Sequence, residues 1–307
     1  MKGLELCRAY FEAYGRPMLE SEFSDVMDRI AVGLVGHGSE CFGFDDEISQ
    51  DHDFEPGFSL WLTDEDEQKF GFRLFRAYRK LPKTFMGITL KEESVFGSKT
   101  RGVHTITEFY SYYTGSSGAP ETLNTWVKIP SFYLAEATNG EVFQDPLGEF
   151  SRIRQTILEG MPEDAEKKRL ASSLFLMAQA GQYNVARCLK HGESGAASLA
   201  LARFAENAIQ VIYLLNRRFA PYYKWAFRAL DSLSFLVEEG RLLEKTLSGP
   251  MGMHTVEAIE KIASGVIDCL IQQGYAVSLG DYLEPYAYHI NETIQDGGLR
   301  TAPLIIS

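Results

Sequence analysis

Cysteine is scarce in this chain of 307 residues, which contains only four. Cys7, Cys41, Cys188 and Cys269 stand far apart in the sequence. No two of them form a Cys-x-x-Cys pair, the spacing typical of zinc and redox sites. The sequence therefore predicts neither a structural zinc site nor a disulfide framework.

Long apolar runs are also missing. No uninterrupted apolar stretch reaches the ~18 residues that identify a membrane-spanning helix. The first fifteen residues, MKGLELCRAYFEAYG, have the spacing of an amphipathic helix rather than the pattern of a signal peptide. These features predict a cytoplasmic protein without a membrane segment.

Basic residues are outnumbered, with 30 Lys and Arg against 42 Asp and Glu, and the net charge is −12. A general nucleic-acid-binding protein needs a basic face, so this charge balance argues against that class. The sequence also lacks a GxxxxGK[ST] run, a GxGxxG following a strand and a GxSxG elbow. Any nucleotide chemistry must therefore rest on another motif.

The composition that is present favours a folded protein, with 45% hydrophobic and 23% charged residues. A chain of this length corresponds to about two domains. Strand and helix patterns alternate up to residue 149, and from residue 150 onward the strand signals nearly vanish. The sequence predicts an α+β protein, with a small mixed-sheet domain at 1–149 followed by an all-α helical bundle at 150–307.

The expected elements follow from hydrophobic spacing and from turn residues. Strands are predicted at 29–35, 58–62, 102–106 and 141–143. A helix over 1–28 is expected to be interrupted at Gly15-Arg16-Pro17, and Thr63 and Thr107 are expected to cap later helices. The remaining helices are predicted at 126–137 with a break at Pro130, 150–159, 162–180, 182–191, 195–218, 220–238, 240–248, 251–274 and 279–295.

One stretch near the N-terminus carries the clearest chemistry. Gly38-Ser39 follows a buried strand, and after eleven residues comes Asp51-His52-Asp53. Two aspartates two apart on an extended chain point to the same face and suit Mg²⁺ or Mn²⁺. A Gly-Ser turn can offer backbone N–H groups and a hydroxyl to phosphate oxygens. His37 beside it is interpreted as a turn residue.

This pattern resembles the signature of the nucleotidyltransferase superfamily, which includes kanamycin, lincosamide and minimal nucleotidyltransferases. The segment GLVGHGSECFGFDDEISQDHDF most resembles a bacterial family of unknown function in which such a domain is fused to a HEPN-like helical domain. The resemblance implies a polymerase-beta-like fold and Mg²⁺- or Mn²⁺-dependent transfer of a nucleoside monophosphate from a nucleoside triphosphate to a hydroxyl of a small molecule or protein. It assigns the triphosphate turn to Gly38 and Ser39 and the catalytic metal pair to Asp51 and Asp53.

The superfamily often has a third carboxylate on a later strand, and here the sequence departs from the pattern. The strand expected at 102–106 has no acid, and His104 occupies the corresponding position. Glu108 is a candidate catalytic carboxylate, with stabilisation of a helix first turn as the alternative. Glu141 is another candidate. A module that binds nucleotide without turnover is the rival hypothesis.

The helical half offers another source for a general base. Residues 180–230 resemble the C-terminal helical domain of kanamycin-type enzymes, in which a glutamate serves as the base and the active site forms between two subunits. The resemblance nominates Glu206 and implies a homodimer as one option. The alternative interpretation of Glu206 is a solvent-facing residue of a helix.

A cluster of aromatic and cationic residues lies further along. Tyr222, Trp225 and Arg228 are spaced to share one helix face, and Lys224 and Arg228 are an i, i+4 pair. Lys224 and Arg228 are candidates for contact with the triphosphate, and Tyr223 is a candidate for stacking on the nucleotide base. The alternative is an aromatic seam between helices with cations extending to solvent.

A ribonuclease of the HEPN type is a weaker alternative. These enzymes use an arginine and a histidine with four to six residues between them, whereas Arg187 and His191 have only three residues between them. A component of a toxin–antitoxin system is a further alternative. The sequence favours a nucleotidyltransferase, whose nucleotide and acceptor it does not specify.

Overall fold

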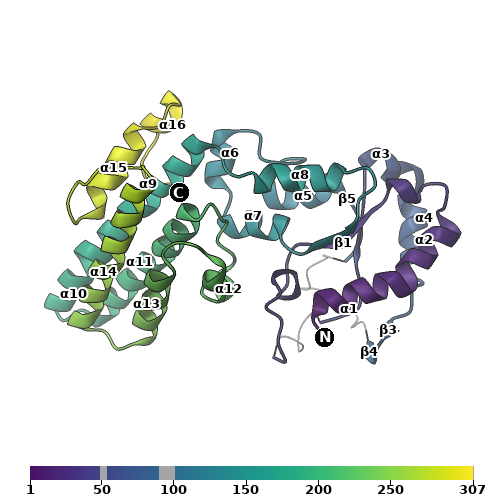
Figure 1. Ribbon diagram of the computed structural model, residues 1–307, viewed down its shortest axis with the longest axis horizontal. Coiled ribbons are helices and arrows are strands. Elements are labelled where there is room, and N and C mark those ends of the chain that lie inside the picture. Colours follow the sequence, from purple (N-terminus) through teal and green to yellow (C-terminus); the bar gives the residue numbers. More distant parts are fainter. Residues whose placement is uncertain (49–53, 90–100, 307) are drawn as a thin grey trace. The chain divides into compact units, whose positions relative to one another are not determined.

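The computed structural model describes residues 1–48, 54–89 and 101–306 (Figure 1). The chain divides by packing into two compact units. The first comprises Met1–Glu121 and Tyr133–Glu159, and the second comprises Thr122–Phe132 and Gly160–Ser307. A mixed α+β architecture with a small sheet and a helical C-terminal region is confirmed. The division into domains at residue 150 stays a prediction.

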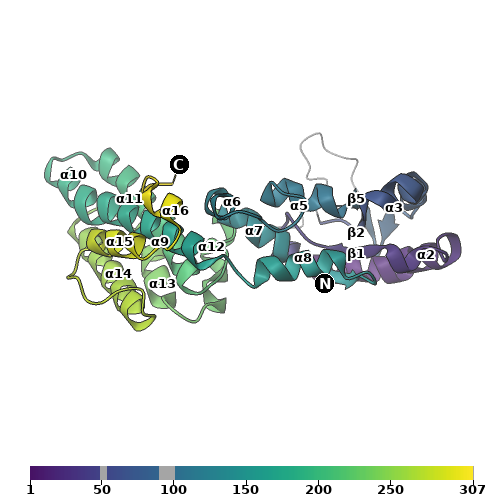
Figure 2. The same cartoon turned by 90° about the horizontal axis from the view of Figure 1, so that it is seen from above.

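A four-stranded sheet in the order β5-β2-β1-β6 forms the centre of the first unit (Figure 2). Its strands are β1 (Ala31–Leu34), β2 (Ser59–Leu62), β5 (Gly102–Thr105) and β6 (Glu141–Gln144). β1 pairs antiparallel with both β2 and β6, and β2 pairs parallel with β5. A separate hairpin consists of β3 (Thr84–Phe85) and β4 (Ile88–Thr89). The four strands predicted from the sequence are therefore confirmed.

Helices cover both faces of this sheet because successive side chains of a strand point to opposite sides. On one face, Leu60 and Leu62 join the aromatic core below the N-terminal helices. On the other, the Trp61 ring stacks on Phe150, with centroids 4.1 Å apart. The helices of this unit are α1 (Gly3–Tyr10), α2 (Arg16–Glu22), α3 (Asp64–Asp66), α4 (Phe72–Tyr78), α5 (Ile106–Thr114), α7 (Ser131–Thr138, whose first two residues belong to the second unit) and α8 (Glu149–Leu158).

The predicted interruption at Gly15-Arg16-Pro17 is wrong. A π-helical turn, Phe11–Gly15, joins α1 to α2, and Pro17 lies in the first turn of α2. Glycine at position 15 serves packing, because a Cβ there would lie 2.5 Å from the Phe58 ring. A proline in the first turn lacks only an N–H that has no helical partner in any case. The helix therefore continues through a sequence typical of a break.

The N-terminal caps were predicted with mixed success. Thr63 caps α3 as predicted, since its hydroxyl accepts from Asp66 N at 3.1 Å. The prediction for Thr107 is wrong, because Thr105 caps α5 in a capping box with Glu108. Thr107 instead donates to Asp64 Oδ2 at 2.9 Å.

An ion pair between Arg29 and the buried carboxylate of Asp66 links the start of the sheet to α3. It predicts how the free energy of unfolding depends on pH. The Asp66 carboxylate is 1% exposed and accepts from Arg29 Nε at 2.8 Å. Burial opposes ionisation, but the hydrogen bonds from Arg29 and Thr63 outweigh it and lower the pKa of Asp66. A lowered folded-state pKa stabilises the fold above the unfolded value, and that contribution is lost as the pH falls through the folded-state pKa.

We expect Asp66→Asn to destabilise the protein at pH 7, and the difference from the wild type to shrink as the pH falls below the ordinary aspartate pKa of ~3.9 towards the lower folded-state pKa. Chemical unfolding of both proteins between pH 7 and pH 3 measures this. The exposed neighbour Asp28 gives the control, and Asp28→Asn should shift the free energy of unfolding by less than about 0.5 kcal/mol. A wild-type advantage over Asp66→Asn that grows on acidification would contradict the assignment.

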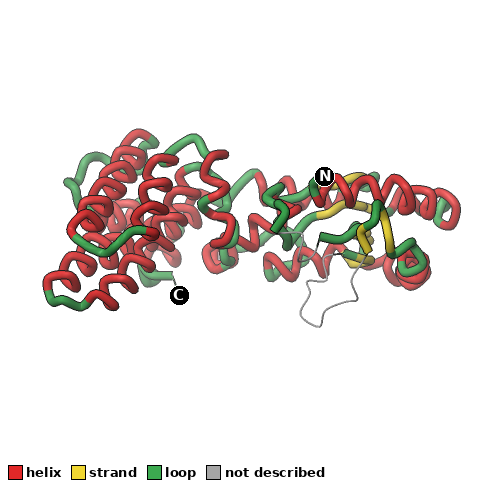
Figure 3. The backbone as a smooth tube through the Cα atoms, turned by 90° about the horizontal axis from the view of Figure 1, so that it is seen from below, coloured by secondary structure: helices red, strands yellow, loops and turns green. Residues whose placement is uncertain are grey.

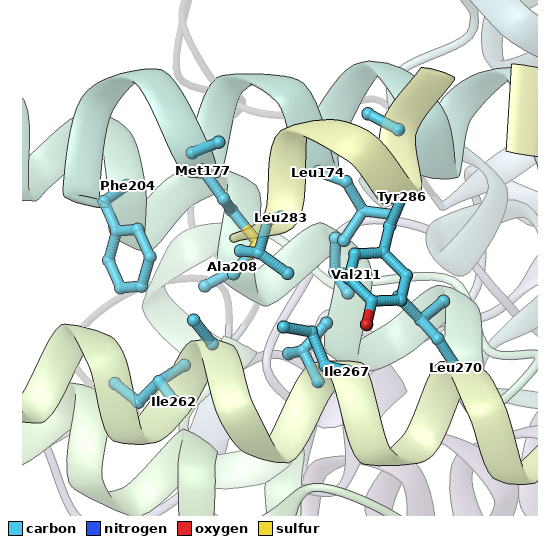
Figure 4. Packing of buried hydrophobic residues seen from close by; sticks show 14 of the residues in the cluster. Leu174, Met177, Phe204, Ala208, Val211, Ile262, Ile267, Leu270, Leu283 and Tyr286 are labelled. Atoms are coloured by element: carbon cyan, nitrogen blue, oxygen red, sulfur yellow. The ribbon is translucent and has the colours of Figure 1, made fainter. Parts of the chain in front are cut away.

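The second unit is helical throughout its described length, whereas the strands, yellow in Figure 3, all belong to the first. Its core comes from five long segments, among them the continuous helix from Glu163 to Lys190 (Figure 4). The helices are α6 (Leu123–Lys128), α9 (Glu163–Met177), α10 (Ala186–Lys190), α11 (Ser194–Leu215), α12 (Tyr223–Ala226), α13 (Val237–Ser248), α14 (Met253–Gln272), α15 (Leu283–Glu292) and α16 (Gly297–Thr301).

Two helix predictions in this unit are wrong. A break at Gly181 is replaced by a π-helical segment, Ala178–Val185, in which a Cβ on Gly181 would lie 2.3 Å from the Phe204 ring. The glycine thus permits close packing of two helices. The helix predicted at 220–238 is only α12 and a 3₁₀ segment, because Ser234 N and Phe235 N donate to the Asn216 side chain.

Candidate functional site

The candidate site lies where several strands of the first unit begin or end. Gly33, near the end of β1, is opposite Ser59 at the start of β2, and Ser59 is opposite Gly102 at the start of β5. β6 begins opposite Leu34. The segments that follow β1 and precede β2, β5 and β6 therefore meet at one end of the sheet.

The loop after β1 is held by hydrogen bonds to its backbone. Gly36 N donates to Asn139 Oδ1 at 2.8 Å, and Asn139 Nδ2 returns a bond to Gly36 O at 2.7 Å. Arg154 in turn donates to the carbonyls of Thr138 and Asn139 at 2.7 and 3.0 Å. Gly36 and Gly38 have φ values of 119° and 125°, a conformation that favours glycine. The turn that contains Gly38-Ser39 is thus fixed by the fold itself.

A buried ion pair connects this turn to the segment before β2. Glu40 Oε1 accepts from Arg101 Nη2 at 3.0 Å, and the two side chains are 6% and 15% exposed. The Glu40 carboxylate packs so closely on Gly38 that a Cβ there would lie 2.5 Å from Oε2. Arg101 crosses Gly57, where a Cβ would lie 2.6 Å from its Cδ. Arg101 therefore ties the residues on either side of the Asp-x-Asp motif together.

Two thiols border this ion pair. Cys7 and Cys41 are buried. Burial raises the pKa of both, and the neighbouring Glu40 carboxylate raises it further while Arg101 lowers it. A thiol with a raised pKa is protonated at neutral pH and is a poor nucleophile. Cys7 and Cys41 therefore act as core residues.

A second carboxylate approaches the same loop from α7. Glu136 is 5% exposed, and its Oε1 lies 3.4 Å from His37 Nδ1. The His37 side chain is 55% exposed. Tyr113 on α5 lies against the backbone of His37, and burial raises the pKa of this tyrosine. A buried acid thus orients a half-exposed imidazole directly before Gly38-Ser39.

The predicted metal pair, Asp51 and Asp53, lies outside the described residues, as does His52. Gly38 and Ser39 are described, half-buried, in the loop after β1. Within the ranges that the structure describes, no group of three or more His, Cys, Asp or Glu side chains is arranged to hold a metal ion. The role of the aspartates stays a prediction from the motif.

The candidates for a third acid are engaged in local contacts. β5 is Gly102-Val-His-Thr105 and carries no acid. Glu108 completes the capping box of α5, since its Oε2 accepts from Thr105 N at 3.1 Å. Glu141 forms an ion pair with Arg8. A catalytic role for Glu108 or Glu141 stays a prediction.

The candidates from the helical half belong to the second unit. Glu206 is exposed on α11, and Tyr223 and Lys224 are exposed on α12. Arg228 begins the following 3₁₀ segment, with its guanidinium 5.3 Å from the Trp225 ring centroid. α12 ends at Ala226, so Tyr222, Trp225 and Arg228 do not lie on one long α-helix, although Arg228 and Trp225 are in contact.

Tyr222 contributes to an aromatic contact instead. Its ring centroid lies 4.4 Å from that of Tyr223 and 5.4 Å from that of Phe132. Tyr223 nevertheless has 67% of its surface exposed. Tyr222 thus takes part in aromatic packing, as the alternative interpretation expected. Nucleotide contact by Tyr223, Lys224 and Arg228 stays a prediction.

The rival ribonuclease motif has ordinary helix-surface surroundings. Arg187 lies on α10 with its guanidinium 5.7 Å from the Tyr183 ring centroid, and His191 is the exposed C-cap of that helix. Both side chains belong to one helix end. In the described part of the chain, the contacts of Arg187 and His191 give no further support for a ribonuclease.

Sequence reasoning missed the two buried carboxylates, Glu40 and Glu136, and their pairing with Arg101 and His37. Glu40 follows Gly38-Ser39 directly, and Glu136 interrupts an apolar stretch of α7, which was the available signal. Arg101 and His37 lie 61 and 99 residues from their partners. Only the register of the sheet brings such distant positions together.

Among the helices in the described part of the chain, none combines the length and the apolar character needed to cross a bilayer.

Comparison with known proteins adds one match. Among curated proteins, none matches this chain. Residues 126–226, about a third of the chain, match a family described as a domain of unknown function (DUF4037). The matched segment includes α7 with Glu136, and also Glu206, Tyr223 and Lys224. Over this segment the chain is similar to DUF4037.

Proposed function

We propose that this protein transfers a nucleoside monophosphate from a nucleoside triphosphate to an acceptor hydroxyl in a metal-dependent reaction. One observation carries the proposal. Arg101 spans Gly57, six residues after Asp51, and bonds Glu40, which packs on Gly38. Arg101 thereby links the Gly38-Ser39 turn to Gly57, which follows the aspartate pair in the sequence.

The loop after β1 supplies the triphosphate contacts in this proposal. Its turn is fixed by Asn139 without a ligand, so little entropy is lost when phosphate oxygens bind. Glu40 covers one side of Gly38. Phosphate oxygens therefore approach the backbone N–H groups and the Ser39 hydroxyl from the opposite side.

The divalent ion, Mg²⁺ or Mn²⁺, is assigned to Asp51 and Asp53. The described carboxylates beside the loop face cationic or imidazole groups, since Glu40 bonds Arg101 and Glu136 faces His37. They are therefore not available as ligands in this arrangement. A bound divalent ion neutralises phosphate charge and orients the reacting groups.

The acceptor is a hydroxyl of a small molecule or of a protein. The net charge of −12 favours the approach of a cationic acceptor. Glu206 and Glu108 stay candidates for a base, and Lys224, Arg228 and Tyr223 for further nucleotide contacts. Completion of the site by a second copy of the chain is an option that the kanamycin-type resemblance supplies.

The second candidate function is a module that binds nucleotide without turnover. The observation that favours it is the sequence of β5, Gly102 to Thr105, which has no carboxylate. A site without that acid still has Gly38, Ser39 and the aspartate pair for binding.

The proposal is tested by pyrophosphate release from the wild-type protein. Each of ATP, GTP, CTP and UTP is supplied with Mg²⁺ or Mn²⁺, with and without a panel of aminoglycosides and protein acceptors. We expect release with at least one nucleotide, abolished by EDTA and restored by added metal. Nucleotide binding without release under every condition would favour the binding module, and absence of both would contradict the site.

A further inference from the structure

The imidazole of His37 stands at the mouth of the candidate loop and is oriented by a buried acid. Its Nδ1 lies 3.4 Å from Glu136 Oε1, and the exposed fractions of the two side chains are 55% and 6%. The imidazole thus faces a buried carboxylate through Nδ1, while about half of its side-chain surface is exposed. An acid at Nδ1 fixes the ring orientation and the tautomer in which Nε2 accepts a proton.

The backbone around this dyad is fixed from two directions. Asn139 bonds both polar groups of Gly36, directly before His37. Tyr113 on α5 lies against the backbone of His37 itself. A histidine that served only as a turn residue would need neither a buried carboxylate nor this anchoring, because burying Glu136 costs free energy unless a partner stabilises its charge.

Several titratable groups face the dyad. Tyr112 and Tyr113 approach Glu136 from α5, Tyr133 lies one turn before it on α7, and Cys41 approaches from the loop after β1. Burial and the Glu136 carboxylate raise the pKa of Tyr113 well above its ordinary value, and the pKa of Cys41 is raised too. The raised pKa values keep Tyr112, Tyr113 and Cys41 neutral near pH 7, whereas the ordinary pKa of a histidine lies near neutrality.

We infer that His37, positioned by Glu136, is the general base that activates the acceptor hydroxyl. The inference rests on the proposed nucleotidyl transfer. His37 Nε2 takes the hydroxyl proton while the acceptor oxygen bonds to the α-phosphorus. The bond from that phosphorus to the bridging oxygen breaks, and pyrophosphate leaves with the electron pair. The imidazolium then returns its proton to water. Glu136 is a positioning residue in this scheme.

A base at His37 would explain how the reaction proceeds without a carboxylate on β5. Glu108 is engaged in the cap of α5 and Glu141 in an ion pair with Arg8. His37 directly precedes the turn assigned to the triphosphate, so its ring is one residue from Gly38. A base supplied by the loop itself needs neither of those carboxylates.

The test uses His37→Ala with imidazole rescue in the full-length protein. We expect pyrophosphate release with acceptor to fall about 10²- to 10³-fold in kcat, with the nucleotide KM within about threefold of wild type. Added imidazole should restore the rate at least about tenfold, because it replaces a proton acceptor rather than a packed side chain. Since His37 is half-exposed, the variant is expected to fold.

Controls separate a chemical role from a structural one. The matched control is His254→Ala, an exposed histidine whose Nε2 faces the Pro250 carbonyl, and it should neither lose activity nor respond to imidazole. Glu136→Gln should lower kcat about 10- to 100-fold and alter the acid limb of the pH–rate profile. That limb should be absent in His37→Ala.

The outcomes distinguish this inference from the proposed function. Metal-dependent release by the wild type that His37→Ala leaves unchanged, or an acid limb that persists in that variant, would overturn the role of His37 and leave the transfer reaction intact. Absence of release by the wild type would contradict the transfer reaction and the role of His37 with it.

Discussion

Substituting Asp51 or Asp53 by asparagine is expected to lower the rate of pyrophosphate release at least about 10³-fold, because a metal contributes several kcal/mol of charge stabilisation and ~1.4 kcal/mol corresponds to a factor of ten. Asparagine keeps the size of the side chain and removes the charge. The reaction should be followed at saturating nucleotide with Mg²⁺ and again with Mn²⁺.

Glu47 provides the matched control for these substitutions. It is an exposed acid in the same stretch of sequence and stands outside the motif. Glu47→Gln should keep at least about half of the wild-type rate, since an exposed charge outside the site contributes little. Equal losses in all three variants would indicate a general effect of charge and would contradict a metal pair at Asp51 and Asp53.

Removal of the Arg101 guanidinium is the substitution with the largest expected effect on stability. Arg101→Met leaves the Glu40 carboxylate buried without this partner, which costs roughly 3–5 kcal/mol in comparable pairs. Both side chains are largely buried, and their closest oxygen–nitrogen distance is 3.0 Å. Native-state hydrogen exchange of the β1 and β2 amides measures the loss within the first unit.

The pair of Glu12 and Arg16 supplies a surface comparison in the same unit. Arg16 Nε donates to Glu12 Oε2 at 2.6 Å, but the two side chains are 37% and 45% exposed. Arg16→Met should therefore cost less than about 1 kcal/mol. If the two substitutions destabilised β1 and β2 equally, burial of the Arg101–Glu40 pair would not be what holds the loop.

Local pattern was sufficient to predict the strands of the sheet. The runs at 29–35, 58–62 and 102–106 each contain the observed strand, and the run at 141–143 covers β6 except for its last residue, Gln144. Three of them are apolar or alternating runs bounded by glycine or polar residues, which is a short-range signal. The order of the strands required long-range information, because β5 pairs with β2 and β6 pairs with β1.

Two of the errors arose at glycine or proline, and the reason is physical. Gly15 and Gly181 lie inside continuous helices, where each makes room for a phenylalanine ring, Phe58 and Phe204. The cost of a glycine in a helix is about 1 kcal/mol, which close packing of a large ring can offset. A packing glycine and a terminating glycine look alike in a single sequence.

Only the part of the candidate site that lies in one sequence motif could be predicted from the sequence. Gly38 and Ser39 could be assigned from their spacing to Asp51 and Asp53, because all four residues lie within one short stretch of the sequence. Glu40 and Glu136 could not, since their roles depend on partners brought in by β5 and by the loop after β1. The sequence marked where phosphate chemistry was expected, and the packing added the groups that surround it.

Nucleotide-dependent binding of Mn²⁺ tests the central claim without requiring the acceptor. Free Mn²⁺ is followed by electron paramagnetic resonance as the full-length protein is titrated in the presence of a non-hydrolysable nucleoside triphosphate. We expect the wild type to bind Mn²⁺ at least about tenfold more tightly with the nucleotide than without it, a difference of ~1.4 kcal/mol, and the Asp51→Asn, Asp53→Asn double variant to lose this gain. A double variant that binds Mn²⁺ and nucleotide as tightly as the wild type would contradict the metal–triphosphate site.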